Sequence, residues 1–276
     1  MEIKYYKEYS NILGRDMEYK VFGSSGKICF AFAPQSGRFY DFENFHMVDV
    51  ASKWIEEGKL QIVCPDSIDE ESWSGRESGA EDDWRFRKQE EWFLYITDEL
   101  YPTVKARNTS EAAQGRCMTT GCSMGALHAA NFFFRRPDLF DTVIAMSGIY
   151  NAQYFFPGTS HPLAYDNSPA IFLKNMPADH PYRKLYANST IIICVGQGAW
   201  EDELLESTRE LDTTMKAAGI DAWFDYWGKD VNHDWNWWQK QFPYFLGKIF
   251  DHQEAPEAAP AADEAASAKT SEDTAD

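Results

Sequence analysis

The residues with the clearest chemical potential form the pentapeptide Gly121-Cys122-Ser123-Met124-Gly125, which has the pattern GxSxG. The motif follows an apolar, strand-like run and opens a stretch of small residues that is typical of a helix. A sharp turn between a strand and a helix holds a serine strained and exposed, and the flanking glycines let the backbone pack closely. The motif in this context predicts that Ser123 is a nucleophile, and the alternative is a plain Gly-Ser turn.

A serine hydroxyl needs a base, and the chain has six histidines that could serve in that role. His233 lies in the segment GKDVNHDW, between the last strand-like run and the last helical run. This position would bring it to the same sheet edge as Ser123. His128 lies in the helix that follows Ser123, where it is expected to pack or cap. We therefore predict that His233 is the general base.

An acid that orients the histidine is expected after the penultimate strand, because the order is then serine, acid, histidine. That region contains the three consecutive acids Glu201, Asp202 and Glu203. We predict Asp202, with Glu201 as the alternative. The other acids could be helix N-terminal charges that the helix dipole favours. The chosen carboxylate would accept the imidazole N–H and stabilise the imidazolium.

A tetrahedral intermediate needs N–H donors for its oxyanion. The first predicted donor is the amide of Met124, because the first N–H groups of a helix have no partner within the helix. The second is expected in the loop APQSGRFY at 33–40, near Gly37 and Arg38. A plain polar turn is the alternative for this loop.

The elements that must position these residues alternate between strand-like and helical patterns. Strand-like runs occur at 3–9, 16–23, 27–33, 60–65, 116–120, 141–146, 190–195 and 222–227. The first two look antiparallel, and the later ones are continuously apolar and separated by helical stretches such as 85–100, which Pro102 would stop. This pattern predicts an α/β fold with a mostly parallel sheet of about eight strands and helices on both faces.

The domain organisation follows from the same patterns. Residues 1–252 are predicted to form one catalytic domain, with an irregular, cap-like insertion at about 150–189. Residues 253–276 are an acidic, Ala/Pro-rich tail without any aromatic or large aliphatic residue. Such a segment cannot bury enough apolar surface to offset the entropy of ordering, so it is expected to be disordered.

The composition excludes several classes of function. With 26 Lys and Arg against 44 Asp and Glu, the 276-residue chain has a net charge of −18, which disfavours nucleic acids and anionic membranes. No apolar run is long enough to cross a bilayer, and the start lacks the apolar stretch of a secretory signal, so we expect a cytoplasmic protein. The five cysteines have neither disulfide-scaffold nor zinc-ligand spacing, so neither a disulfide scaffold nor structural zinc is expected. Catalysis by a serine with a histidine base requires no metal or organic cofactor.

Aromatic residues are abundant at 16%, and several lie in segments expected near the site edge. Aromatic walls suit sugar rings or aryl acyl groups, although a tryptophan can equally fill the core. The candidate substrate-binding residues are Trp73, Trp84, Tyr150, Trp200 and Trp235.

Several segments together resemble bacterial esterases of the α/β-hydrolase fold. The elbow GCSMG, the loop PQSGRFYDFENF, the segment PDSIDEESW and the ending WGKDVNHDWNWW carry the resemblance, which spans most of residues 15–250. The group includes S-formylglutathione hydrolases, feruloyl and acetyl-xylan esterases and mycolyltransferases. The resemblance implies a triad on Ser123, Asp202 and His233, and an oxyanion hole from the amides of Met124 and Arg38. Many relatives have an HG dipeptide in the early loop, where this chain has Gln35-Ser36-Gly37.

The hypothesis from the sequence is therefore a serine carboxylic-ester hydrolase that acts through an acyl-enzyme on a small-molecule ester. The expected substrates are small acyl or aryl esters, including sugar-linked ones. The alternatives are an acyltransferase or a thioesterase with the same triad, or a non-catalytic binding module on this fold. The oligomeric state stays open.

Overall fold

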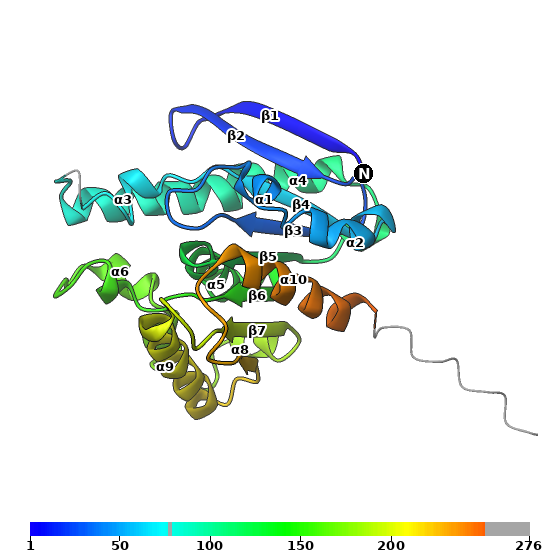
Figure 1. The fold of residues 1–276 in the computed structure, drawn as a ribbon. Helices are drawn as coiled ribbons and strands as arrows, with labels where there is room; N and C mark the ends of the chain where they lie inside the picture. The colour runs from blue at the N-terminus through cyan, green and yellow to red at the C-terminus, as the bar shows by residue number, and fades with distance from the viewer. Residues whose placement is uncertain (77–78, 252–276) are drawn as a thin grey trace, which may run out of the picture.

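The computed structural model describes residues 1–76 and 79–251, and its centre is an eight-stranded sheet in the order β1-β2-β4-β3-β5-β6-β7-β8 (Figure 1). The predicted eight strands are all present, with ends within two residues of the predicted ones. The tail predicted at 253–276 lies outside the described residues. The strands are β1 (Ile3–Ser10), β2 (Arg15–Phe22), β3 (Lys27–Phe32), β4 (Leu60–Pro65), β5 (Cys117–Cys122), β6 (Phe140–Met146), β7 (Thr190–Val195) and β8 (Trp223–Tyr226).

The sheet is mixed and mostly parallel, as predicted. Strand β2 pairs antiparallel with β1 and with β4, whereas β4, β3, β5, β6, β7 and β8 are parallel neighbours. The carboxyl ends of the parallel strands therefore meet at one edge. The loops that follow β3, β5, β7 and β8 lie at this edge, so it gathers segments far apart in the sequence.

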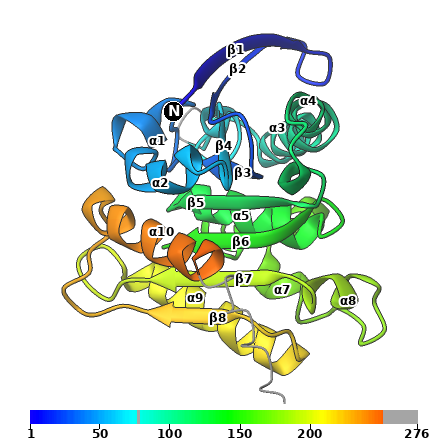
Figure 2. The same ribbon diagram turned by 90° about the vertical axis from the view of Figure 1, so that its right-hand side faces the viewer.

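Helices cover both faces of the sheet (Figure 2). Helices α1, α2 and α10 pack on one face, and α3, α4, α5, α7, α8 and α9 contribute to the core on the other. Strand β3 shows why the strands are apolar at every position: Phe30 and Phe32 pack in the core on one face of the sheet, and Cys29 and Ala31 pack in the core on the other face. The helices are α1 (Asp41–Asn44), α2 (Ser52–Glu56), α3 (Asp82–Leu94), α4 (Tyr101–Arg107), α5 (Met124–Arg135), α6 (Pro162–Asp166), α7 (Pro169–Phe172), α8 (Tyr182–Tyr186), α9 (Asp202–Ala218) and α10 (Trp235–Phe250).

The prediction that Pro102 stops a helix is wrong. Helix α3 passes into a π-helical turn at Tyr95–Leu100 and then into α4, which has Pro102 in its first turn. Proline is tolerated there because the first N–H groups of a helical segment need no partner inside it. The π-helical turn therefore lets the helical path continue past the proline.

The segment 150–189 is less irregular than the sequence predicts. It contains a 3₁₀ turn at Ala152–Tyr154 and the short helices α6, α7 and α8. Its buried Ala152, Phe156 and Ala164 pack with Trp73 and Phe86 in a small core of their own. The segment is thus anchored against α3 and the loop before it.

All five cysteines are buried as free thiols. Three of them lie in the strand interiors where the apolar pattern predicts small buried residues. Within residues 1–76 and 79–251, no helix combines the length and the apolar character that a membrane span requires.

Candidate active site

Ser123 occupies a sharp turn between β5 and α5. Its φ of 57° and ψ of −124° lie outside the regions that residues other than glycine prefer. A side chain at position 121 would overlap the carbonyl of Gly125, and one at position 125 would overlap the carbonyl of Phe32. The two glycines of the motif are therefore required because the turn folds tightly on itself and against β3.

His233 contacts this serine across 110 positions of the chain. Its Nε2 lies 2.9 Å from Ser123 Oγ. The backbone N–H of His233 donates to the carbonyl of Ala199 at 3.0 Å, and its ring packs edge-on against Trp238 at 4.9 Å. The loop that follows β8 thus brings together the two residues that the sequence paired.

The carboxylate behind this imidazole belongs to Glu201. Its side chain is 1% exposed, and Oε2 lies 3.6 Å from His233 Nδ1. That distance is within reach of an ion pair and longer than a hydrogen bond, and neither atom has a hydrogen-bond partner among the described residues. The other oxygen, Oε1, accepts from the hydroxyl of Ser147 at 2.6 Å, and Trp238 Nε1 donates to that hydroxyl at 3.3 Å.

The preference for Asp202 is not what the structure shows. Asp202 is the exposed first residue of α9, and among the described residues the carboxylate within ion-pair distance of His233 is that of Glu201. Glu201, the alternative, immediately precedes the helix and is directed inward. Three adjacent acids cannot be told apart from the sequence, because the residue that faces the histidine depends on where the helix begins.

Close backbone contacts join the loops that carry the acid and the histidine. The N–H of Gly198 donates to Val231 at 2.8 Å, and the N–H of Ala199 donates to Asn232 Oδ1 at 2.8 Å. A side chain at position 198 would overlap the amide oxygen of Asn232. Gly198 and Asn232 are thus supporting residues that the sequence analysis missed, and the glycine before the acid run was the available signal.

The predicted second oxyanion donor requires a correction. The N–H of Gly37 donates to Pro34 at 2.9 Å, and the N–H of Arg38 donates to Asp41 Oδ2 at 2.9 Å, so neither amide is free. The Arg38 guanidinium binds Asp66 and Glu18. Both predicted donors are therefore already hydrogen-bonded to nearby residues of the loop and of α1.

Another residue of this loop, Gln35, has a free backbone amide. The N–H of Gln35 makes no hydrogen bond with any residue that the structure describes, and the residue Gln35 lines the same cavity as Ser123 and Met124. Met124 is the first residue of α5, so its N–H has no partner within the helix. The amides of Met124 and Gln35 are therefore the candidate donors to an oxyanion near Ser123.

A cavity of about 190 Å³ lies over Ser123 and His233. Of the five predicted aromatic residues, Trp200 alone lines this cavity within the described part of the chain, and it is 84% exposed with a φ of 67°. The sequence analysis missed most of the lining, because the cavity draws on five separate segments of the chain. The cavity is lined by Gln35, Ser123, Met124, Ile149, Tyr154, Phe155, Trp200, Glu203, Leu204 and His233.

The other four aromatic predictions are wrong about the cavity. Trp73 is buried against Phe155 and Phe156, and Tyr150 is fully buried in the main core. Trp235 stacks on Phe45 with ring centroids 4.4 Å apart, and Trp84 lies on α3 and is 39% exposed. Each of these rings finds a packing partner or solvent elsewhere, which local sequence does not reveal.

The electrostatics of the site favour the serine over the neighbouring thiol as nucleophile. Burial raises the pKa of Cys122 well above its ordinary value, so its sulfur stays protonated. The hydrogen bond to Glu203 raises the pKa of Tyr154, which keeps this phenol neutral at the cavity wall. Among the described residues, no cluster of His, Cys, Asp and Glu could hold a metal ion.

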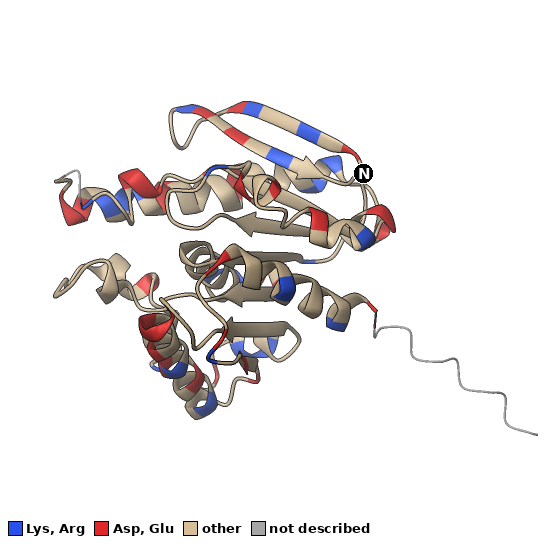
Figure 3. Ribbon diagram, viewed as in Figure 1, with Lys and Arg blue, Asp and Glu red and all other residues tan. Residues whose placement is uncertain are grey.

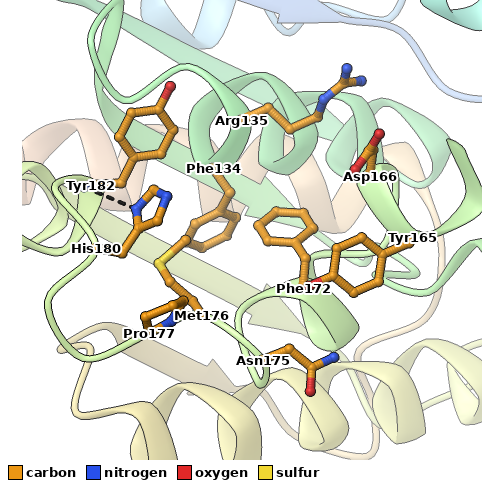
Figure 4. Close-up of a pocket in the computed structure, with 10 residues that line it drawn as sticks. All are labelled: Phe134, Arg135, Tyr165, Asp166, Phe172, Asn175, Met176, Pro177, His180 and Tyr182. Carbon is orange, nitrogen blue, oxygen red and sulfur yellow. Dashed lines mark hydrogen bonds between the residues drawn. The ribbon is translucent and has the colours of Figure 1, made fainter. Parts of the chain in front are cut away.

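A larger cavity of about 300 Å³ lies between α5 and the segment that carries α6, α7 and α8 (Figure 4). Phe134, Tyr165 and Phe172 line it, with Arg135 and Asp166 at its edge. It contains none of the predicted site residues, so the chemistry predicted from the sequence maps to the smaller cavity.

Comparisons with known proteins identify the family and agree with the fold. The family model described as "Putative esterase" matches residues 10–249. A ferulic acid esterase is similar in structure, with a TM-score of 0.69 and 18% identity over 90% of this chain and 99% of its own. An S-formylglutathione hydrolase from Staphylococcus aureus is similar with a TM-score of 0.65 and 14% identity. The match covers 90% of this chain and 96% of that protein. MPT51 (FbpC1) from Mycobacterium tuberculosis is similar with a TM-score of 0.67 and 14% identity. The match covers 90% of this chain and 98% of that protein. No curated protein matches significantly.

Proposed function

The chain belongs to the family described as "Putative esterase", and from this premise we propose that it hydrolyses carboxylic esters through an acyl-enzyme on Ser123. One observation carries the proposal: the 2.9 Å contact between Ser123 Oγ and His233 Nε2 at a strained turn, with the buried Glu201 behind the imidazole. A nucleophile within hydrogen-bond reach of a base that a third group orients is the geometry of nucleophilic acyl transfer.

The proposed mechanism uses groups of this chain and water. Ser123 Oγ attacks the ester carbonyl carbon while His233 Nε2 accepts the hydroxyl proton, and Glu201 stabilises the resulting imidazolium. The amides of Met124 and Gln35 donate to the oxyanion. The tetrahedral intermediate then breaks the bond to the alkoxy oxygen, which receives the proton from His233. Water repeats these steps on the acyl-enzyme and releases the carboxylic acid.

Two linked measurements test this proposal. A fluorophosphonate probe should label the protein at a single residue, and mass spectrometry should identify that residue as Ser123. Nitrophenyl esters of rising acyl length should be hydrolysed, with kcat/KM highest for short chains, because the cavity over the serine is only about 190 Å³. An adduct at another residue, or none together with no hydrolysis of any ester, would refute the proposal.

The same residues could transfer the acyl group to an alcohol instead of water. The exposure of Trp200 at the cavity wall argues for hydrolysis, because water reaches this side of the site. Adding candidate alcohols and measuring the ratio of transfer product to free acid separates the two outcomes.

We further propose that the preferred ester is uncharged. Glu203 contributes a carboxylate to the cavity, and none of the described lining residues is Lys or Arg. Asp202 and Glu203 begin α9, where Figure 3 shows a concentration of acidic residues. A negative potential at the site lowers the local concentration of anionic substrates.

Glu203→Gln is therefore expected to raise kcat/KM for an anionic ester by about threefold at low salt, because one repulsive charge is removed. The measurement compares 4-acetoxybenzoate with its neutral methyl ester, for which kcat/KM should stay within about twofold. Added salt should screen the difference because Glu203 is exposed.

Asp202→Asn is the matched control, since it removes the same charge from the adjacent residue, which does not line the cavity. If both variants gain equally toward the anionic ester, the overall charge of the protein and not the position of Glu203 sets the preference.

A further inference from the structure

A buried acid–imidazole pair lies outside the proposed triad. His128 Nε2 and Asp69 Oδ1 are 2.8 Å apart, and both side chains are 1% exposed. His128 belongs to α5, and Asp69 begins a 3₁₀ turn in the segment after β4. The rings of Trp92 and Phe32 pack around His128, at 4.8 and 6.2 Å. The pair therefore connects two segments that are distant in the sequence inside an aromatic environment.

The second oxygen of Asp69 binds the loop that carries Gln35. The N–H of Ser36 donates to Asp69 Oδ2 at 3.0 Å. Ser36 has a φ of 56°, in the left-handed region that disfavours residues with a side chain. The adjacent residue, Gln35, supplies the free amide at the cavity. Asp69 thus holds a strained residue directly next to the proposed oxyanion donor.

The same carboxylate consequently reaches both halves of the proposed oxyanion hole. Through His128 it is attached to α5, whose first residue, Met124, supplies one amide. Through Ser36 it is attached to the loop whose Gln35 supplies the other. Oxyanion donors act only at about hydrogen-bond distance from the oxygen, so the separation between the two amides must be held closely.

Burial makes this pair costly to maintain. Well-packed apolar residues often replace a buried charged pair without loss of stability. Stability alone therefore does not explain why a carboxylate is buried here. A role in positioning does explain it, because one oxygen of Asp69 binds His128 and the other accepts from the N–H of Ser36.

We propose that Asp69 and His128 are positioning residues that set the spacing of the Met124 and Gln35 amides around the oxyanion. This inference rests on the proposed esterase function. The pair does not contact the ester itself, so its effect belongs to the transition state and not to substrate binding.

His128→Phe tests the inference, because it keeps a ring in the aromatic environment and removes the bond to Asp69. We expect kcat for a nitrophenyl ester to fall about 10- to 100-fold, with KM within about twofold, since a loosened donor acts mainly in the transition state. The inhibition constant of a boronic acid, whose tetrahedral adduct occupies the same site, should rise in parallel with the loss of kcat. His128→Gln can still donate to Asp69 and should recover most of kcat.

Asn131→Ala is the control on the same helix. Asn131 is buried and binds Asn167, away from the loop at 33–40, so its loss should leave kcat within about twofold. Asp69→Asn is the second test variant if His128→Phe fails to fold, because one amide oxygen replaces two carboxylate oxygens and cannot accept from both partners. It should lower kcat in the same way.

The outcomes separate the two proposals. Absence of ester hydrolysis and of phosphonate labelling in the unaltered protein would refute the function. An active protein whose folded His128→Phe or Asp69→Asn variant keeps kcat within twofold would overturn the positioning role. An equal loss of kcat in Asn131→Ala would also overturn it, because general loosening of α5 would then explain the effect.

Discussion

Ser123→Ala should lower kcat for ester hydrolysis by about 10⁵- to 10⁶-fold, because the nucleophile and the base act as one unit. The Ser123 hydroxyl is bound by His233, and its loss leaves only the buried thiol of Cys122 next to the turn. Alanine meets the same backbone restriction as serine at a φ of 57°, so the fold and the melting temperature should not change appreciably. The measurements are steady-state kinetics, fluorophosphonate labelling and thermal unfolding.

Cys122→Ala is the matched control next to the nucleophile. Its thiol is fully buried and its pKa is raised by that burial, so it cannot replace Ser123. The substitution is expected to lower stability by creating a small cavity in the core, while kcat stays within about twofold. Full activity in Ser123→Ala, or a loss in Cys122→Ala as large as that in Ser123→Ala, would contradict the assignment of the nucleophile.

Glu201→Gln should lower kcat by about 10⁴-fold, whereas Asp202→Asn should leave it within about twofold. Glutamine keeps an oxygen that can accept from Ser147, but it loses the charge that stabilises the imidazolium. It can also direct an N–H toward His233 Nδ1, which favours the wrong tautomer of the imidazole. Steady-state kinetics of the two variants, measured in parallel, distinguish the two neighbouring acids.

The thermal stability of these two variants provides an independent measurement. Glu201 is buried, and Oε2 has no hydrogen-bond partner among the described residues, so Glu201→Gln removes a charge that is costly to bury. The melting temperature should therefore stay constant or rise while activity falls. A large loss of activity in Asp202→Asn, with an active Glu201→Gln, would reverse the assignment of the acid.

Backbone strain is concentrated around the candidate site. Ser36, His46, Ser123, Ser147 and Trp200 are the described residues other than glycine with positive φ. Four of the five belong to the candidate site or lie beside it, since Ser123 is the candidate nucleophile, Ser36 follows Gln35, Ser147 binds Glu201 and Trp200 precedes that acid. Residues in such conformations persist only where the surrounding structure holds them, and they cluster at functional sites.

The fold was largely predictable because its signals are local. Continuous apolar runs predicted the eight strands, and the context of GCSMG predicted the turn at Ser123. The order of elements also paired His233 with Ser123, because loops after parallel strands share one edge. Pro102 misled the helix prediction because the π-helical turn before it depends on packing and not on residue type.

The finer assignments depended on tertiary structure. Glu201 faces His233 because α9 begins one residue later. Gln35 replaces Gly37 and Arg38 as the candidate donor because the amides of those two residues are bound within their own loop. The direction of a side chain at a helix start and the hydrogen bonds inside a loop arise from contacts between distant segments. Residue type and spacing along the chain therefore determined the candidate nucleophile, the candidate base and the sheet, while only the packed structure decided which acid and which amide lie beside them.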